Sequence, residues 1–453
     1  MPDKLAKESG WLSESSVIGK IFSRRMLICI VLGFSSGLPL YLLINLISAW
    51  LRSSSVDLED IGIFSAVAGV PYVWKFLWAP LLDRYDILRR GRRRSWMLLT
   101  QVILLVLISL LGFFDPVKSY TAVLVICTLI AVASATQDVA LDAYRREILP
   151  DNELGLGNSM FINAYRIAGM IPGGLSLILS DSLPWVLVFP LTALFMLPGI
   201  IASLVVREPA TEHLPRTLLE SVVQPFAEFV RRKGVLGALG VIAFIFLYKF
   251  GDNMATAQAT PFYIDMGYTK TQIGMVNKVV GLWSMVLGGI VGGILMLKIG
   301  INKALWLFGI GQIVTILGYV LIAHVWKHPD FIPGILNWLG THGIYSGSVE
   351  FAFPSVFLLS LVVGAEALGA GLGTACFVAY MCRETNRAYV ATQLALFTAL
   401  SAIPRTVCVA FTGYAIKWAG WENFFIICYA LAIPGMVMLI YIAPFHSKEN
   451  SGE

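Results

Sequence analysis

Charged residues are scarce in this sequence. Only 13% of its 453 residues are Asp, Glu, Lys or Arg, whereas 57% are hydrophobic, and the mean hydropathy is +0.76. These values exclude an ordinary soluble globular protein and a disordered chain. Apolar runs of 18 or more residues recur along the whole sequence, which predicts an all-α membrane protein whose helices cross the bilayer repeatedly.

Histidine and cysteine are also few, and neither shows the spacing of a metal site. The five histidines lie in predicted loops, in the tail or at the end of a span, and the six cysteines lie in or beside apolar runs. Such cysteines are predicted to be buried small hydrophobes rather than disulfide partners or zinc ligands. No Walker A lysine loop is present, which argues against an ATP-driven pump. We therefore expect neither an enzyme nor a bound metal or organic cofactor.

Twelve apolar stretches are long enough to span a bilayer, so both termini should lie on one side. The two tails and the connections after even-numbered spans hold most of the 33 basic residues, and the positive-inside rule then makes both termini cytoplasmic. The opposite connections hold only Arg52, Lys118, Lys270, Lys327 and Lys417. The predicted spans cover residues 26–50, 60–82, 96–114, 120–144, 156–180, 184–206, 236–263, 272–298, 303–325, 355–382, 388–417 and 422–444.

The longest predicted cytoplasmic connection divides the spans six and six. The two halves repeat each other, since Arg166 lies eight residues before Gly174 and Arg405 lies eight residues before Gly413. This repetition predicts two pseudo-symmetric six-helix bundles with a site between them. The predicted parts are a cytoplasmic N-terminal segment at 1–25, a bundle at 26–206, a linker at 207–235, a bundle at 236–444 and a cytoplasmic tail at 445–453.

Two carboxylates lie within the fourth predicted span. Asp138 and Asp142 are four residues apart, which places both on one face of a helix. A carboxylate at membrane depth costs about 2.5–3.5 kcal/mol on insertion scales. The pair therefore predicts an interior polar path, and we interpret the two residues as proton carriers. The alternative is that both form structural ion pairs with Arg145 and Arg146 at the cytoplasmic end of the span.

Further charges also lie within predicted spans, which marks a path for a substrate or an ion. Lys75 lies close to a cytoplasmic end, so we expect its side chain to reach the interface. The others, together with two amides, are candidates for substrate binding or gating. They are Arg166, Lys249, Asp252, Lys278, Glu366, Arg405, Gln137 and Asn277.

Alternatives remain open for several of these charges. Lys249 and Asp252 are three residues apart and could simply neutralise each other. Lys278 could pair with Asp252 or Glu366 across helices. Arg166 and Arg405 could be symmetric gate residues that pair with Asp138 or Asp142. Glycines of small-x-x-x-small spacing, such as Gly288 and Gly292, are predicted to allow close helix packing.

The connection after the second predicted span combines a carboxylate with arginines. We predict a conformational latch made of Asp83, Arg84, Arg92 and Arg93, which would hold a neighbouring helix in one state and release it in another. The alternative is orientation by positive charge, which accounts for the arginines but not for Asp83. The turn resembles the G-x-L-x-D-R-x-G-R-R signature of the major facilitator superfamily. It departs from the signature by a proline at the first glycine position and by five residues inserted at 86–90.

Several longer stretches together resemble the AmpG-type muropeptide permeases of the same superfamily. The resemblance extends from about residue 26 to residue 440. The Gln-Asp-x-x-x-Asp pattern at 137–142 also resembles acetyl-coenzyme A transporters of the endoplasmic reticulum. The stretches that carry the resemblance are residues 33–40, 75–85, 137–143, 248–252, 276–278 and 391–402.

This resemblance implies a function and a location. It implies import of N-acetylglucosaminyl-1,6-anhydro-N-acetylmuramyl peptides from periplasm to cytoplasm across the bacterial inner membrane, for peptidoglycan recycling and indirectly for β-lactam resistance. It also implies dependence on the proton gradient, with carboxylates matching Asp138 and Asp142 essential. The expected partners are the anhydromuropeptide, protons and the lipid bilayer, with no nucleic acid, and the expected state is a monomer. Another anionic solute, such as a short peptide or an acyl-nucleotide, remains the alternative cargo.

Overall fold

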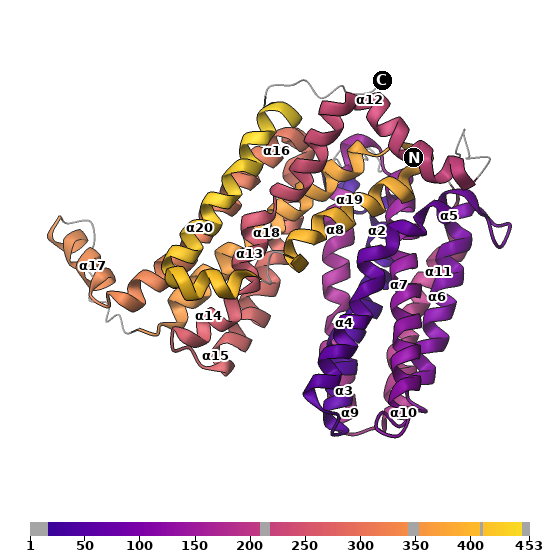
Figure 1. Ribbon diagram of the computed structural model, residues 1–453, viewed down its shortest axis with the longest axis horizontal. Helices are drawn as coiled ribbons and strands as arrows, with labels where there is room; N and C mark the ends of the chain where they lie inside the picture. Colours follow the sequence, from indigo (N-terminus) through magenta and orange to yellow (C-terminus); the bar gives the residue numbers. More distant parts are fainter. Residues whose placement is uncertain (1–16, 209–217, 343–352, 408–410, 446–453) are drawn as a thin grey trace, which may run out of the picture. The chain divides into compact units, whose positions relative to one another are not determined.

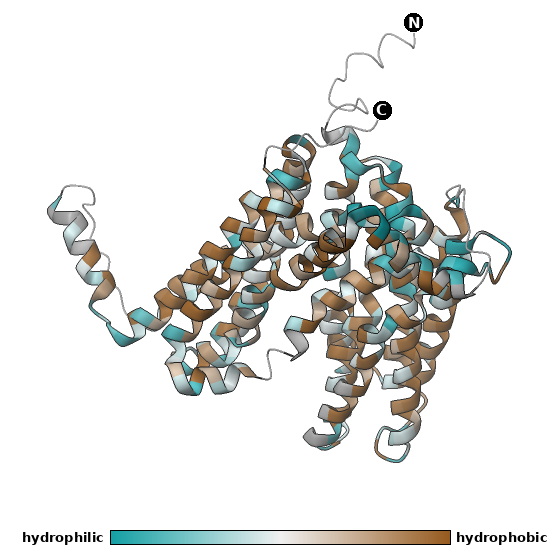
Figure 2. Cartoon of the chain, turned by 45° about the horizontal axis from the view of Figure 1, so that its top comes forward, coloured by the Kyte–Doolittle hydropathy of each residue, from teal (hydrophilic) through white to brown (hydrophobic). Residues whose placement is uncertain are grey.

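The computed structural model describes residues 17–208, 218–342, 353–407 and 411–445. Every regular element in these ranges is helical (Figure 1), which confirms the predicted all-α class. Within the described ranges, nine helical stretches are long and apolar enough to cross a membrane. Figure 2 shows that the long helices are mostly hydrophobic along their length, whereas polar residues gather at helix ends and in connections. The count of twelve spans stays a prediction.

The chain packs as two compact units. Unit 1 comprises Met1–Val235 together with Val378–Ala399, and unit 2 comprises Leu236–Phe377 together with Leu400–Glu453. The segment Val378–Ala399 includes the end of one long helix and the start of the next. Because this segment belongs to unit 1, residues that are far apart in the sequence pack together. The predicted division of the chain at residue 235 does not anticipate this.

Unit 1 is built around α2 and α8, which approach each other closely. A Cβ placed on Gly33 would lie 2.3 Å from the carbonyl oxygen of Phe161, and one on Gly37 would lie 2.2 Å from that of Tyr165. Only glycine permits this backbone contact. The long helices of unit 1 are α2 (Arg24–Tyr41), α4 (Leu58–Trp74), α6 (Arg92–Leu111), α7 (Tyr120–Ile148), α8 (Leu154–Ala168), α10 (Trp185–Ala193) and α11 (Leu197–Val205).

Short helices and irregular turns complete unit 1. The π-helix η2 (Leu42–Ile47) continues α2 into α3 (Ser48–Ser53), and the short α5 (Ala79–Arg84) follows α4. Trp50 of α3 is 1% exposed, and its ring lies 4.9 Å from that of Phe189 in α10. Aromatic packing therefore closes the end of unit 1 that contains α3 and α10.

In three long helices a glycine with a positive φ interrupts the helical conformation. Gly234, Gly300 and Gly420 have φ values of 72°, 77° and 75°, a region that favours glycine. Each break divides one helix into two segments. The interrupted helices are α12 (Leu218–Leu247), α16 (Leu282–Lys327) and α20 (Thr412–Ile442).

Aromatic rings form part of the core of unit 2. Phe262, Tyr319 and Phe425 pack in the core of unit 2, with the ring of Phe425 4.7 Å from that of Phe262 and 4.9 Å from that of Tyr319. The remaining elements are α13 (Phe250–Ala257), α14 (Ala259–Asp265), α15 (Lys270–Met275), η7 (Val276–Gly281), α17 (Phe331–Thr341), α18 (Val356–Glu384), η8 (Arg387–Tyr389) and α19 (Val390–Val407).

The predicted close packing through glycine is confirmed between α16 and α18. A Cβ on Gly288 would lie 2.3 Å from the carbonyl oxygen of Leu368, and one on Gly371 would lie 2.3 Å from that of Met285. The two backbones thus touch where small residues face each other, as in membrane helix pairs.

We predict that Gly288→Ala destabilises the protein by about 1–3 kcal/mol, because the added methyl group overlaps a backbone carbonyl. The matched control is Gly311→Ala on the same helix, where a Cβ meets nothing within 4 Å. Alanine should be tolerated there or slightly stabilising. Thermal unfolding in detergent, followed by a thiol-reactive fluorophore that labels the buried cysteines as they become exposed, measures both effects. Equal unfolding temperatures for the two variants would contradict this prediction.

Candidate functional site

Asp138 lies buried on α7 without an ion-pair partner. It is 9% exposed, and Oγ of Ser36 on α2 donates a hydrogen bond to its carboxylate. Among the described residues, no basic group lies within 4.0 Å of this carboxylate, although Lys75 is near enough to interact with it electrostatically. The expectation that Lys75 reaches the interface is wrong, because its side chain is only 8% exposed and packs within unit 1. Within the described part of the chain, the polar contact that the structure gives the Asp138 carboxylate is therefore a hydroxyl and not a cation.

Asp142, one turn further along α7, has a different environment. Its carboxylate lies 2.9 Å from the guanidinium of Arg145, which is 3% exposed and lies 4.0 Å from the centre of the Phe161 ring. Arg146 pairs instead with Asp151 at 2.9 Å. The structural ion pair considered for both carboxylates is thus present for Asp142 and absent for Asp138, which separates their chemistry.

Several buried polar atoms on α7 and α8 lack a hydrogen-bond partner among the residues that the structure describes. Gln137 donates to Oγ of Ser35 at 3.2 Å, but its Oε1 has no partner in the structure. Both amide atoms of Asn163 and Nη1 of Arg166 are likewise buried and unpaired. Arg166 forms no ion pair with Asp138 or Asp142 within 4.0 Å. An unmet buried polar group costs about 1–3 kcal/mol, so these atoms are candidates for binding a polar ligand or water.

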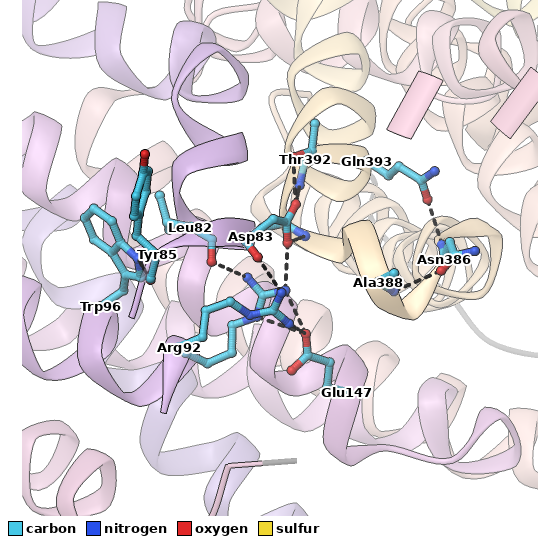
Figure 3. Close-up of polar contacts among 12 residues, drawn as sticks. Leu82, Asp83, Tyr85, Arg92, Trp96, Glu147, Asn386, Ala388, Thr392 and Gln393 are labelled. Carbon is cyan, nitrogen blue, oxygen red and sulfur yellow. Dashed lines mark hydrogen bonds and ion pairs between the residues drawn. The ribbon is translucent and has the colours of Figure 1, made fainter. Parts of the chain in front are cut away.

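A second polar cluster, in the same unit, contains Asp83 at the end of α5 (Figure 3). Asp83 is fully buried, and its carboxylate lies 2.8 Å from the guanidinium of Arg93. Arg93 also pairs with Glu147 of α7 at 2.7 Å. The same carboxylate accepts hydrogen bonds from the backbone N–H groups of Ala391 (3.2 Å) and Thr392 (2.9 Å) and from the Thr392 hydroxyl (2.7 Å). Asp83 thus binds the first turn of α19, where backbone donors and the helix dipole favour an anion.

Of the other two residues of the predicted latch, Arg92 joins this cluster and Arg84 does not. Arg92 is 6% exposed, donates to the backbone carbonyl of Asp83 and lies 3.3 Å from Glu147. Arg84 lies outside the cluster, with its guanidinium 5.1 Å from the centre of the Tyr85 ring. Orientation by positive charge alone does not account for arginines that are buried between carboxylates.

The inserted residues at 86–90 form a closed turn rather than disturbing the cluster. The carboxylate of Asp86 accepts hydrogen bonds from Oγ of Ser95 and from the backbone N–H groups of Gly91 (2.9 Å) and Arg90 (3.3 Å). Partial burial acts to raise the pKa of Asp86, but these hydrogen bonds hold it below its ordinary value. The insertion therefore folds back onto the start of α6 and leaves Arg92 and Arg93 in place.

Two acidic residues that the sequence analysis did not single out contribute to this region. Glu147 bridges Arg92 and Arg93, as described above. Glu208 accepts hydrogen bonds from the backbone N–H groups of Arg93 (2.9 Å) and Arg94 (3.2 Å), and so caps the first turn of α6. Both glutamates lie at the ends of predicted spans, where a charge is ordinary, so no sequence signal distinguishes them.

The linker helix contacts the connection between α18 and α19. Glu228 of α12 accepts hydrogen bonds from the side chains of Asn386 (3.0 Å) and Gln393 (2.9 Å). Lys233 lies 2.6 Å from Glu384. The linker is therefore a structural part of unit 1, and it contacts the same short connection whose end Asp83 binds.

In unit 2, Lys249 lies at the centre of a buried polar cluster. Its Nζ donates to Oε1 of Gln312 at 3.0 Å and to Oγ1 of Thr374 at 3.3 Å, and lies 3.6 Å from the carboxylate of Asp252. The considered pairing of Lys249 with Asp252 is thus present. Glu366 on α18 is 8% exposed, and its Oε1 has no hydrogen-bond partner in the structure.

Two of the remaining candidates, Asn277 and Lys278, do not join these clusters. Asn277 and Lys278 are exposed in the π-helix η7, and Lys278 forms no ion pair with Asp252 or Glu366 within 4.0 Å. The side chain of Arg405 lies outside the described residues. The structure therefore brings the candidates together as one group around Asp138, one around Asp83 and one around Lys249.

Comparison with known proteins adds evidence from homology. Residues 26–349 match the family model of the Major Facilitator Superfamily. The chain is 48% identical over 96% of its length to a Haemophilus influenzae protein described as uncharacterized, of which it covers 98%. It is 37% identical over 94% of its length to the anhydromuropeptide permease of Escherichia coli K12, of which it covers 81%. Its structure is similar to that of the major facilitator transporter FucP, with a TM-score of 0.66, 12% identity and coverage of 91% and 98% of the two chains, a likeness of fold alone.

We predict that Asp142→Asn destabilises the protein by about 3 kcal/mol, because it leaves the buried guanidinium of Arg145 without a counter-charge. Asp138→Asn breaks no ion pair and should cost less. The double variant Asp142→Asn/Arg145→Gln should recover part of the loss. Thermal unfolding of the purified variants in detergent tests the order. An Asp138→Asn variant as unstable as Asp142→Asn would contradict it.

Proposed function

Because the chain belongs to the Major Facilitator Superfamily and, within it, to the family of anhydromuropeptide permeases, we propose that it imports anhydromuropeptides from periplasm to cytoplasm together with protons. The proposed transport serves peptidoglycan recycling, and through it the induction of β-lactam resistance. The observation that carries the proton step is the buried carboxylate of Asp138, which accepts a hydrogen bond from a hydroxyl and has no cation within 4.0 Å among the described residues. A desolvated carboxylate of this kind can exchange a proton as its access to water changes.

The proposed architecture follows that of the family. We infer twelve spans in two six-helix bundles, in the inner membrane, with both termini in the cytoplasm. The division of the chain at residue 235 and the glycine breaks in α16 and α20 support this count, because each break allows one helix to serve as two segments. Alternating access then exposes the polar groups to one side of the membrane at a time.

The unpaired polar atoms of unit 1 match the chemistry of the proposed cargo. A muropeptide presents sugar hydroxyls and amides, which the side chains of Gln137 and Asn163 can bind. It also presents peptide carboxylates, for which Arg166 offers a bidentate fork. In the structure these groups are buried with unmet hydrogen-bonding capacity, so the ligand gains their hydrogen bonds without breaking existing ones.

We propose that Asp83, Arg92, Arg93 and Glu147 form the latch of this transporter. Asp83 holds the first turn of α19 through three hydrogen bonds. Loss of these bonds frees the start of α19 from unit 1 and allows the opposite state to form. Arg93 holds the carboxylate in place against the first turn of α19, so the contact is either made or broken as a unit.

The proposal is tested by uptake of labelled anhydro-disaccharide peptide into proteoliposomes under an imposed inward proton gradient. Wild type should concentrate the cargo. Asp138→Asn should lose gradient-driven uptake by at least about tenfold, while counterflow exchange, which needs no net proton movement, persists. Undiminished gradient-driven uptake in Asp138→Asn would contradict the proton role. Wild type that carries a short peptide or an acyl-nucleotide but no muropeptide would contradict the cargo.

We predict for the latch that Asp83→Asn lowers the uptake rate about tenfold, because it weakens the charge-assisted bonds to α19 and Arg93. Thr392→Val removes only the hydroxyl bond and leaves both backbone bonds to Asp83, so it should lower the rate less than Asp83→Asn does. The control is Asp115→Asn, a half-exposed loop carboxylate that pairs with Lys118 and accepts hydrogen bonds from the backbone N–H groups of Val117 and Lys118. Unchanged uptake in Asp83→Asn at normal expression would refute the latch.

A further inference from the structure

The polar cluster of unit 2 holds more negative than positive charge. Asp252, Glu366 and Lys249 are each 8–9% exposed. Lys249 pairs with Asp252 at 3.6 Å, and among the side chains that the structure describes no cation lies within 4.0 Å of the Glu366 carboxylate. Fully ionised, the three side chains carry one net negative charge in a low-dielectric interior. An unpaired carboxylate there costs several kcal/mol, so the cluster needs a further positive charge.

Polar atoms without hydrogen-bond partners indicate where this additional positive charge would bind. Oε1 of Glu366 and Oδ1 of Asp252 are buried without hydrogen-bond partners. Nε2 of Gln312 is also buried and unpaired, on the amide whose oxygen already binds Lys249. The Glu366 carboxylate interacts electrostatically with Lys249, which precedes α13, and with Asp252 of α13. It also interacts with Tyr263 of α14 and Tyr319 of α16. The phenols are neutral donors, so Lys249 is the one cation among these neighbours.

A proton fits this place better than a metal ion. The ammonium group of Lys249 already lies against Asp252, Gln312 and Thr374, the oxygen ligands that a metal ion would require. A second full cation beside it would be repelled at low dielectric. One proton on a carboxylate makes the cluster neutral and also turns one unpaired acceptor into a donor.

We propose that Glu366 and Asp252 form a second proton-binding site, with Lys249 as its fixed counter-charge. This site lies in unit 2, whereas Asp138 lies in unit 1, so the two proton sites belong to different packed units. One consequence of the site rests on the proposed function: that a transport cycle moves a proton through each unit. The existence of the bound proton is independent of the cargo.

The test is infrared difference spectroscopy of the purified full-length protein in lipid, titrated with pH in the absence of cargo. A protonated buried carboxyl group absorbs at a frequency distinct from that of a carboxylate. Wild type should show two such components. Glu366→Gln should remove one of them and Asp138→Asn the other. Glu422→Gln, which alters a surface carboxylate paired with His324 and Lys327, should remove neither.

Two further variants keep the proposal testable if Glu366→Gln folds poorly. Asp252→Asn removes a neighbouring negative charge, so the Glu366 component should disappear at a pH lower by about one unit or more. Lys249→Met removes the counter-charge and should make the component persist to higher pH. A Glu366→Gln spectrum identical to that of wild type, or a component that neither variant shifts, would overturn the second site.

Transport then separates this inference from the proposed function. If the site is part of the cycle, the proton-to-cargo ratio measured from reversal potentials should fall from two in wild type to one in Glu366→Gln. A ratio of one in wild type would overturn the role of unit 2 in coupling while leaving proton-coupled import intact. Absence of muropeptide uptake together with two infrared components would overturn the cargo and leave the second site standing.

Discussion

The cost of placing charge in an apolar interior determines which residues of this protein are structural and which are free to act. The pairs around Asp83 balance: two arginines, Arg92 and Arg93, lie between Asp83 and Glu147, and all four are buried. Asp142 is balanced by Arg145 in the same way. Among the residues that the structure describes, neither Asp138 nor Glu366 has such a partner within 4.0 Å. An interior charge without a partner is unstable. At these two carboxylates a bound proton can neutralise the negative charge, as an arginine neutralises that of Asp83 or Asp142.

Close helix packing positions these groups. Gly37 touches the backbone of α8 and stands next to Ser36, whose hydroxyl binds Asp138. Gly373 stands next to Thr374, and a Cβ at Gly373 would lie 2.2 Å from Oε1 of Gln312, the amide oxygen that binds Lys249. In each unit a glycine therefore lets a neighbouring helix approach until a small polar side chain reaches the charged residue. A substitution at either glycine would push the two helices apart and lengthen these polar contacts, without altering a polar group of the site.

The sequence predicts most of what depends on local spacing. Hydropathy predicts the helices, the interval of three residues predicts the contact of Lys249 with Asp252, and the basic turn predicts that Asp83 meets an arginine. What depends on tertiary structure is not predictable in this way. Asp138 and Asp142 share one helical face, yet only Asp142 is paired, because Arg145 is held against the ring of Phe161 on another helix. Likewise Thr392 contacts Asp83 across 309 positions of sequence, with no local signal that either residue has this partner.

One helix connects the proton site of unit 1 with the proposed latch. Asp138 and Glu147 both lie on α7, nine residues apart, which corresponds to about 13 Å along the axis. A rigid helix transmits displacement over such a distance. In the proposed cycle, a movement of α7 that accompanies proton exchange at Asp138 would therefore also move Glu147 against Arg93. Arg93 contacts Asp83, and Asp83 holds the first turn of α19. The linker contacts the connection that leads into α19 through Glu228, so release requires both sets of bonds to break. Two sets of bonds that must break together favour a two-state transition over a gradual one.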